Sequence, residues 1–214
     1  IHFNFLNKKK FDFSTIFFNA GAHIQHHYFF NSLASQSSFE NPEIKVKKSL
    51  DPFHECLNLY EKILGDYIDN DNYRVILATG LTQLPHEKIE YYYRLNNHKL
   101  FFINLGLKFK KIYPRMSRDF LVEFNNNDER DEFFNGISNI KLNSKLFFGI
   151  IDKRNKSLFI SLTYDKEILK KDYIFANKKN INIFDSVSFV SLKNGVHNQK
   201  GFLYFDSRIR KLLN

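Results

Sequence analysis

The feature that constrains the fold most is an apolar segment, a helix and a second apolar segment in succession. Residues 13–19 are β-branched and aromatic and end in a turn around Gly21, which indicates a buried strand. Residues 73–78 form a second run of the same character. A strand, a helix and a strand in this order predict parallel pairing, because the helix returns the chain to the same end of the sheet.

Two helices are expected between these strands. The first spans residues 23–33, directly after the turn. The second begins at Pro52, with Asp51 as its N-cap, because an acidic cap followed by proline is a common helix start. Apolar residues at helical spacing continue to Tyr67. Residues 34–50, which are rich first in serine and then in lysine, are expected to form a surface loop.

The chain after residue 89 has a different pattern of short strands and a charged helix. We therefore predict an α/β fold, with a partial, mostly parallel sheet and flanking helices in residues 1–89 and 182–214. Residues 90–181 are predicted to be a small α+β insertion. The expected elements from here to the C-terminus are a strand at 117–124, a helix at 128–137, a hairpin formed by 146–151 and 158–164, and strands at 187–192 and 201–205.

Charge and composition narrow the choice of partners. The net charge of +9 favours an anionic substrate, but the lysines lie in short, separate clusters without a stacking or groove-reading motif, which disfavours nucleic acid. No apolar run reaches the roughly 18 residues of a membrane span. Cys56 is the single cysteine, so an internal disulfide is excluded and a cytoplasmic location is favoured. The oligomeric state is not indicated.

Three histidines within five residues are the best candidates for chemistry. His23 and His27 lie four residues apart and share one face of the predicted helix, as do His23 and His26. Such a pair can bind one divalent cation, and neutral imidazole suits zinc. The competing interpretation is a helix start whose histidines face solvent. His54, His86 and His98 are isolated in the sequence and are expected to be surface or capping residues.

A catalytic metal site needs a third ligand and an open position for water or substrate. His197 is the candidate, because it follows Gly195 and precedes Gly201, and glycine lets the backbone come close to a site. The predicted metal ligands are therefore His23, His27 and His197, with His26 as the alternative to one of the helix pair.

These motifs resemble the C-terminal half of the alkaline phosphatase superfamily, in particular its nucleotide pyrophosphatase/phosphodiesterase and sulfatase-like branches. The matching features are the His23-x3-His27 pair, the helix with Tyr60–Gly65, the strand at 73–78 and the later Gly195-Val196-His197. The family's second pair of metal ligands would follow Ala78, where this chain has Thr-Gly-Leu. The resemblance therefore implies a site with one metal ion.

The resemblance further implies a hydrolase that acts on phosphate or sulfate esters with a divalent metal, most simply zinc. Thr79 and Gln83 would contact the substrate from the neighbouring loop. The catalytic nucleophile is not identified. Because the chain starts at Ile1 and its only methionine is Met116, we expect the nucleophile to lie upstream, in the N-terminal half of the family's domain.

The alternative function is a non-catalytic α/β module that binds an anionic partner such as a polysaccharide or a nucleic acid. It predicts a continuous Lys/Arg face that includes residues 108–111, with the histidines dispersed. The hydrolase hypothesis predicts instead that His27 and His197 approach within about 5 Å, because both must reach one ion.

Overall fold

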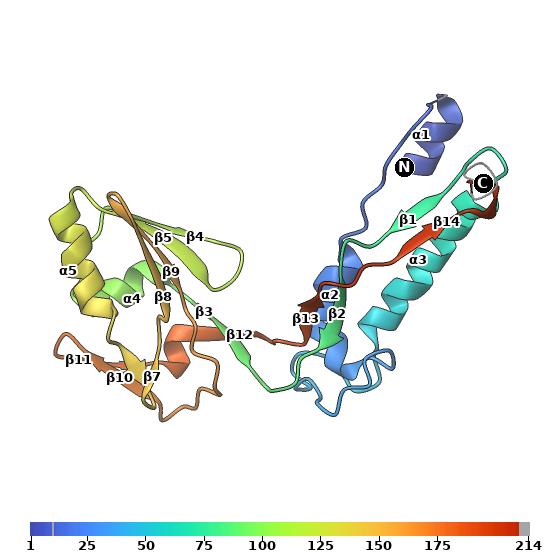
Figure 1. The fold of residues 1–214 in the computed structure, drawn as a ribbon. Helices are drawn as coiled ribbons and strands as arrows, with labels where there is room; N and C mark the ends of the chain where they lie inside the picture. The colour runs from blue at the N-terminus through green and yellow to red at the C-terminus, as the bar shows by residue number, and fades with distance from the viewer. Residues whose placement is uncertain (10, 210–214) are drawn as a thin grey trace. The chain divides into compact units, whose positions relative to one another are not determined.

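The computed structural model describes residues 1–9 and 11–209, which divide into two compact units (Figure 1). Unit 1 consists of Ile1–Lys88 and the chain from Lys193 onward, and unit 2 of Ile89–Leu192. Within this part of the chain, no helix combines the length and the apolar character that crossing a membrane requires.

Unit 1 contains helices and two separate two-stranded sheets. In one sheet β1 pairs with β14, and in the other β2 pairs with β13. The strands of each pair come from opposite ends of the chain, so both sheets depend on long-range contacts. The elements are α1 (His2–Lys8), α2 (Ala20–Tyr28), the 3-10 helix η1 (Phe29–Asn31), α3 (Pro52–Ile68), β1 (Ile76–Ala78), β2 (Thr82–Pro85), β13 (Gly195–Asn198) and β14 (Leu203–Phe205).

The predicted α/β class with a mostly parallel sheet is wrong, because every strand pairing that the structure describes is antiparallel. Residues 13–19 form neither strand nor helix, and Phe13 and Phe17 are 80% and 87% exposed. The second predicted strand exists as β1, but its partner is β14. With no first strand to pair with β1, the rule for strand, helix and strand does not apply.

Helix α3 confirms the expected helix start at Pro52. The Asp51 side chain accepts a hydrogen bond from the backbone N–H of His54 at 2.9 Å, which satisfies one of the free donors of the first turn. The same carboxylate accepts from the Ser32 hydroxyl and from the Leu33 N–H, both at 3.0 Å. Asp51 therefore caps α3 and fixes the chain that follows η1.

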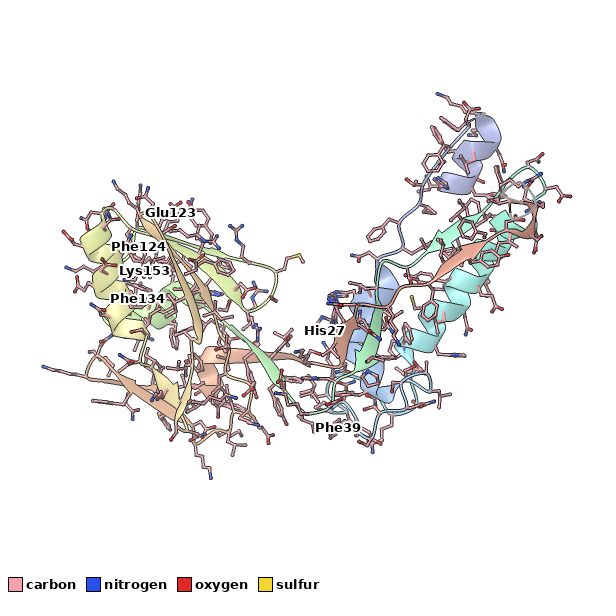
Figure 2. All side chains as sticks on the ribbon, viewed as in Figure 1. His27, Phe39, Glu123, Phe124, Phe134 and Lys153 are labelled. Atoms are coloured by element: carbon pink, nitrogen blue, oxygen red, sulfur yellow. The ribbon has the colours of Figure 1, made fainter. Side chains whose placement is uncertain are left out.

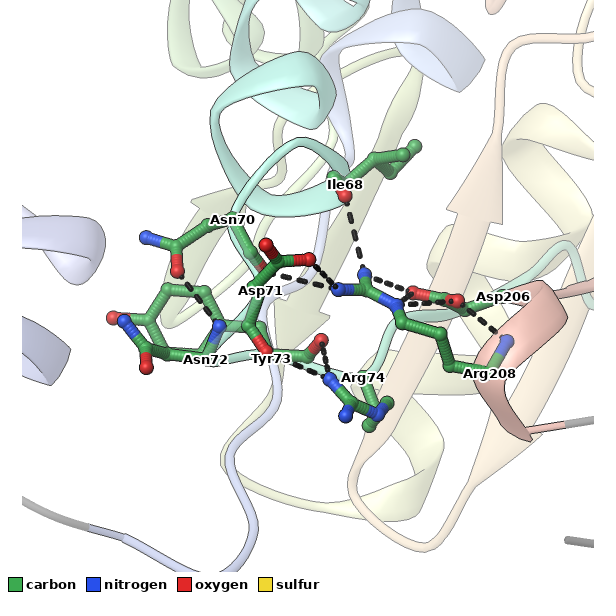
Figure 3. Close-up of polar contacts among 8 residues, drawn as sticks. All are labelled: Ile68, Asn70, Asp71, Asn72, Tyr73, Arg74, Asp206 and Arg208. Atoms are coloured by element: carbon green, nitrogen blue, oxygen red, sulfur yellow. Dashed lines mark hydrogen bonds and ion pairs between the residues drawn. The ribbon is translucent and has the colours of Figure 1, made fainter.

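Arg208 ties the segment after β14 to the end of α3 (Figure 3). Its guanidinium pairs with Asp206 and, at 3.0 Å, with Asp71, and it donates to the Ile68 carbonyl at 3.2 Å. The Asp206 backbone N–H donates to the Val75 carbonyl at 3.0 Å. Hydrogen bonds from Arg208 hold the pKa of the Asp206 carboxyl well below its usual range, so this pair stays ionised at neutral pH.

Unit 2 is built on a four-stranded antiparallel sheet with the order β4-β5-β9-β8. Smaller pairs, β12 with β3, β10 with β11 and β6 with β7, complete the unit. The elements are β3 (Tyr91–Leu95), α4 (His98–Asn104), β4 (Lys111–Pro114), β5 (Asp119–Glu123), α5 (Asn127–Ile137), β6 (Lys141–Leu142), β7 (Lys145–Leu146), β8 (Ile150–Arg154), β9 (Ser157–Ser161), β10 (Tyr173–Ala176), β11 (Lys179–Asn182), the 3-10 helix η2 (Phe184–Ser186) and β12 (Val187–Leu192).

Aromatic side chains form the centre of unit 2. The Phe102 ring lies 4.9 Å from the Phe133 ring and 5.6 Å from the Phe120 ring, centroid to centroid, and all three are fully buried. Alternate residues of β5 and β9 face this core, as the period of a strand requires. At the surface the Lys153 ammonium lies 4.0 Å from the centroid of the Phe134 ring (Figure 2).

Local sequence signals in unit 2 are confirmed. The strand expected at 117–124 is β5, the helix is α5, and the hairpin is β8 with β9, although its first strand begins four residues later than the expected 146–151. Asn126 caps α5 by accepting the Glu129 N–H at 2.8 Å. The strand at 187–192 pairs with β3 and therefore lies in unit 2, whose last residue is Leu192, whereas the insertion was expected to end at residue 181.

The Phe102 side chain is expected to be a main source of stability in unit 2. F102A should lower the free energy of unfolding by about 3–5 kcal/mol, because it removes a buried ring and leaves a cavity. Urea unfolding followed by circular dichroism measures this. F175A, on β10 where Phe175 is 75% exposed, is the matched control and should change stability by about 0.5 kcal/mol or less. Equal effects of the two variants would contradict the assignment of this core.

His98 is buried against Phe120, with 4.8 Å between ring centroids, and the cap of α4 is Asn97, so the expectation of a surface or capping residue is wrong. Burial, with the charge of Arg94, lowers its pKa to about 4. The unfolded chain binds this proton near pH 6.5, so protons favour unfolding. The contribution of His98 to the free energy of unfolding should be fully present above pH 6.5 and should fall by about 2 kcal/mol between pH 7.5 and pH 5. Urea unfolding of H98Q should show a decrease smaller by that amount; an unchanged decrease would refute it.

Candidate histidine site

Helix α2 carries three of the four histidines of the site. His23 and His27 lie one turn apart, with 4.8 Å between their ring centroids. His23 is exposed, whereas His26 and His27 are half-buried. The helix packs closely on α3, where the Tyr60 hydroxyl accepts a hydrogen bond from the Gly21 N–H at 2.6 Å. The histidine face is therefore held on a fixed helix (Figure 2, which labels His27).

The fourth histidine comes from β13. This strand pairs with β2 so that His197 stands opposite Gln83. The Nε2 atoms of His197 and His26 are 3.2 Å apart, and the two ring centroids are 5.0 Å apart. The structure thus brings His26 to His197 and His23 to His27.

The close approach of β13 to α2 depends on glycine. A Cβ atom at Gly195 would lie 2.3 Å from the Gln83 Oε1 atom and 3.2 Å from the Gln25 carbonyl oxygen. The Asn194 backbone N–H donates to the His26 carbonyl at 3.1 Å. This contact fixes the start of β13 beside the residue whose ring meets His197.

A buried carboxamide pair anchors the same junction. Asn194 and Asn41 donate to each other's side-chain oxygen, at 2.8 and 2.7 Å. The Asn194 oxygen also accepts the Phe30 backbone N–H at 2.8 Å, and the Asn31 side-chain oxygen accepts from the Asn41 amide at 2.8 Å. Both paired asparagines are buried. Because buried polar groups are costly without partners, this pair specifies where the loop, η1 and β13 meet.

The surroundings of the histidines keep two of the rings neutral. Burial lowers the pKa of His26, and the charges of His197, His23 and Lys193 act in the same direction, while a hydrogen bond with the Gly195 backbone opposes them. Burial lowers the pKa of His27 to about 4, with smaller contributions from His23 and Lys45. At neutral pH these imidazoles are uncharged, the form in which histidine coordinates a metal.

Two buried polar atoms beside the cluster lack a hydrogen-bond partner among the described residues, the His27 Nδ1 and the Gln83 Oε1. The Gln83 Nε2 atom donates to the Ala22 carbonyl at 3.0 Å, so this side chain links β2 to α2. Thr79 is exposed, and its hydroxyl accepts the Phe202 N–H at 2.8 Å. Both predicted substrate-contact residues therefore bond within unit 1.

The possible metal ligands of the cluster approach one another in two pairs, His26 with His197 and His23 with His27. Across residues 1–9 and 11–209, no group of three or more His, Cys, Asp or Glu side chains is arranged so that it could hold a metal ion. His26 takes the place beside His197 that was expected of His27, and His27 faces His23. A site that holds a metal therefore starts from the His26 and His197 pair and leaves further positions open for another ligand, water or substrate.

Comparisons of the chain with protein-family models, with curated proteins and with solved structures return no match.

Sequence reasoning did not single out Asn194 and Asn41. Asn194 directly precedes Gly195 in a loop between two strands, and Asn41 precedes a proline. Both contexts are typical of exposed turns. The partners lie 153 residues apart, so a single sequence holds no local signal of their pairing.

N194A should disorganise the junction between α2 and β13. The substitution leaves the Phe30 N–H without its acceptor and the Asn41 side-chain oxygen without its donor, while the Asn41 amide keeps its bond to Asn31. We expect a loss of about 2–3 kcal/mol in the free energy of unfolding. Urea unfolding measures it, with N58A, at an exposed position of α3, as the control. A loss no larger than that of N58A would show that the carboxamide pair does not anchor the junction.

Proposed function

We propose that the histidine cluster of unit 1 binds a divalent metal ion and serves the hydrolysis of phosphate or sulfate esters. The observation that carries the proposal is the 3.2 Å separation of the His26 and His197 Nε2 atoms. Two imidazoles on one tetrahedral zinc ion, with bonds near 2.1 Å, have their nitrogens about 3.4 Å apart. The two rings therefore need little movement to share an ion.

The protonation of the pair favours coordination. Burial and the neighbouring positive charges disfavour the charged form of His26. Without a metal, the two Nε2 atoms face each other, and only one of them can carry the proton between them. A cation that binds both rings replaces this contact and is coordinated by both nitrogens. A hydrogen bond between the rings accounts for the same distance, and a zinc titration separates the two interpretations.

His23 is our candidate for a third ligand. It lies three residues before His26, on the same face of α2, and its charge acts on His26. Because the ring is exposed, it can change rotamer without opening a core. In its present rotamer the His23 ring lies against the His27 ring, with 4.8 Å between the ring centroids.

The hydrolase part of the proposal is supported by the chemistry of such a site and by the resemblance of the His23-x3-His27 and Gly195-Val196-His197 motifs to the alkaline phosphatase superfamily. A bound divalent metal polarises a phosphoryl or sulfuryl oxygen or lowers the pKa of a water. The positive charges of Lys45 and Lys193 act on the cluster and favour an anionic substrate. The parallel sheet of that family plays no part in the proposal.

The test is zinc binding by the full chain at pH 7.5, measured by isothermal titration calorimetry. Wild-type protein should bind about one equivalent, and H26A and H197A should each bind at least about tenfold more weakly, because a two- or three-histidine site loses a direct ligand. H54A removes an exposed histidine of α3 outside the cluster and should bind like wild type. Equal affinity of H26A, H197A and H54A would refute the metal site.

The hydrolase activity has its own measurement. With zinc added, the chain should hydrolyse bis(p-nitrophenyl) phosphate, p-nitrophenyl phosphate or p-nitrophenyl sulfate faster than H26A does under the same conditions. Zinc binding that depends on His26 and His197, combined with turnover equal to that of H26A on all three esters, would leave the metal site standing and contradict hydrolysis by this chain.

A further inference from the structure

Unit 2 contains a cavity of about 490 Å³ whose lining includes none of the four histidines of the candidate site in unit 1. Its walls come from the end of β3, the first residues of α4, the strand β4 and the start of β12. Cavities that bind small organic ligands have volumes of roughly 300–1,000 Å³. The cavity is therefore large enough for more than an inorganic ion.

The charge of the cavity is uncompensated. Arg94 and Lys99 line it, and neither forms an ion pair with any residue in the described part of the chain. No Asp or Glu side chain is among its described lining residues. The buried His98 beside them has a pKa lowered to about 4, in part by Arg94, and so adds no charge at neutral pH. Two cations with only neutral neighbours attract an anion into the cavity.

The polar walls are held in place by hydrogen bonds. Ser188 stands opposite Arg94 in the pairing of β12 with β3, and its hydroxyl donates to the Asn96 side-chain oxygen. The Asn96 amide donates to the Asp185 carbonyl at 3.1 Å. These bonds fix the backbone from which Arg94 projects, and a fixed frame lowers the entropy lost when a ligand binds.

A further donor group lines the same cavity. The Asn97 oxygen accepts the Leu100 N–H at 2.9 Å, while the Asn97 amide nitrogen has no acceptor among the residues that the structure describes. An oxyanion can use this amide together with the guanidinium and the ammonium.

The remaining wall is apolar. Ile112 and Pro114 of β4 line the cavity. Alternate residues of a strand point to the same face, so these two side chains form one surface. An apolar wall facing cations matches a ligand with a charged end and an organic body.

We propose that this cavity of unit 2 binds an organic anion, a phosphate or sulfate monoester whose oxyanion contacts Arg94, Lys99 and the Asn97 amide while its organic part packs on Ile112 and Pro114. The guanidinium offers paired donors to two oxygens of such a group. This site is separate from the proposed metal site and does not depend on it.

The test uses the full chain labelled with ¹⁵N and two probes, inorganic phosphate and phenyl phosphate, with potassium chloride at matched ionic strength as the reference. Both probes should give saturable chemical-shift changes at the amides of residues 94–99. Phenyl phosphate should bind more tightly, because its ring packs on the apolar wall. R94Q should weaken the binding of both probes by roughly tenfold or more.

K170Q, which removes one exposed charge elsewhere in unit 2, is the matched control and should bind both probes like wild type. K99Q, at an exposed position of the first turn of α4, repeats the test if R94Q does not fold. H197A should also bind like wild type, which separates this site from the histidine cluster. Shifts that stay linear with concentration, or equal losses in R94Q and K170Q, would overturn the proposal.

Discussion

The buried pairing of the Asn194 and Asn41 carboxamides is the contact on which the histidine site depends. Each group satisfies the other, and the Asn194 oxygen also takes the Phe30 N–H at the start of η1. Few alternative arrangements satisfy all of these donors and acceptors, so the pair selects one position for the start of β13. His197, three residues further along, then meets a histidine that lies 171 residues earlier in the chain.

Several of the local elements could be predicted from the sequence because their causes are local. Asp51 and Pro52 mark the start of α3, and the alternation of β5 and β9 is visible within five residues. The sheet arrangement could not be predicted in this way. The partner of β1 is β14, and nothing in residues 73–78 shows which distant segment will supply its hydrogen bonds. An apolar run such as 13–19 has the composition of a strand whether or not a neighbour exists for it.

The site was predicted in part. The helix cluster and His197 do belong to one unit, and their meeting was inferred from small residues and an apparent turn before each. Whether His26 or His27 meets His197 depends on how α2 is rotated about its own axis. Successive side chains of a helix point in directions about 100° apart, so a rotation of that size exchanges one histidine for the other. That rotation is set by contacts with α3 and β13, in particular the bond from Gly21 to Tyr60. No sequence pattern indicated the cavity lined by Arg94, because its lining residues come from four elements that are brought together only by the tertiary fold.

Because glycine has no side chain, Gly195 limits which substitutions this chain can accept during evolution. Any other residue there would push against the Gln83 amide and the Gln25 carbonyl, and so would separate β13 from α2. Under the proposed function, selection for the pair of His26 and His197 would therefore extend to a position that has no chemistry of its own. In lineages that keep both histidines, this glycine should be among the slowest sites to diverge. The steric limit itself does not come from the histidine rings, so the replacement of either histidine leaves the contacts of Gly195 with Gln83 and the Gln25 carbonyl in place.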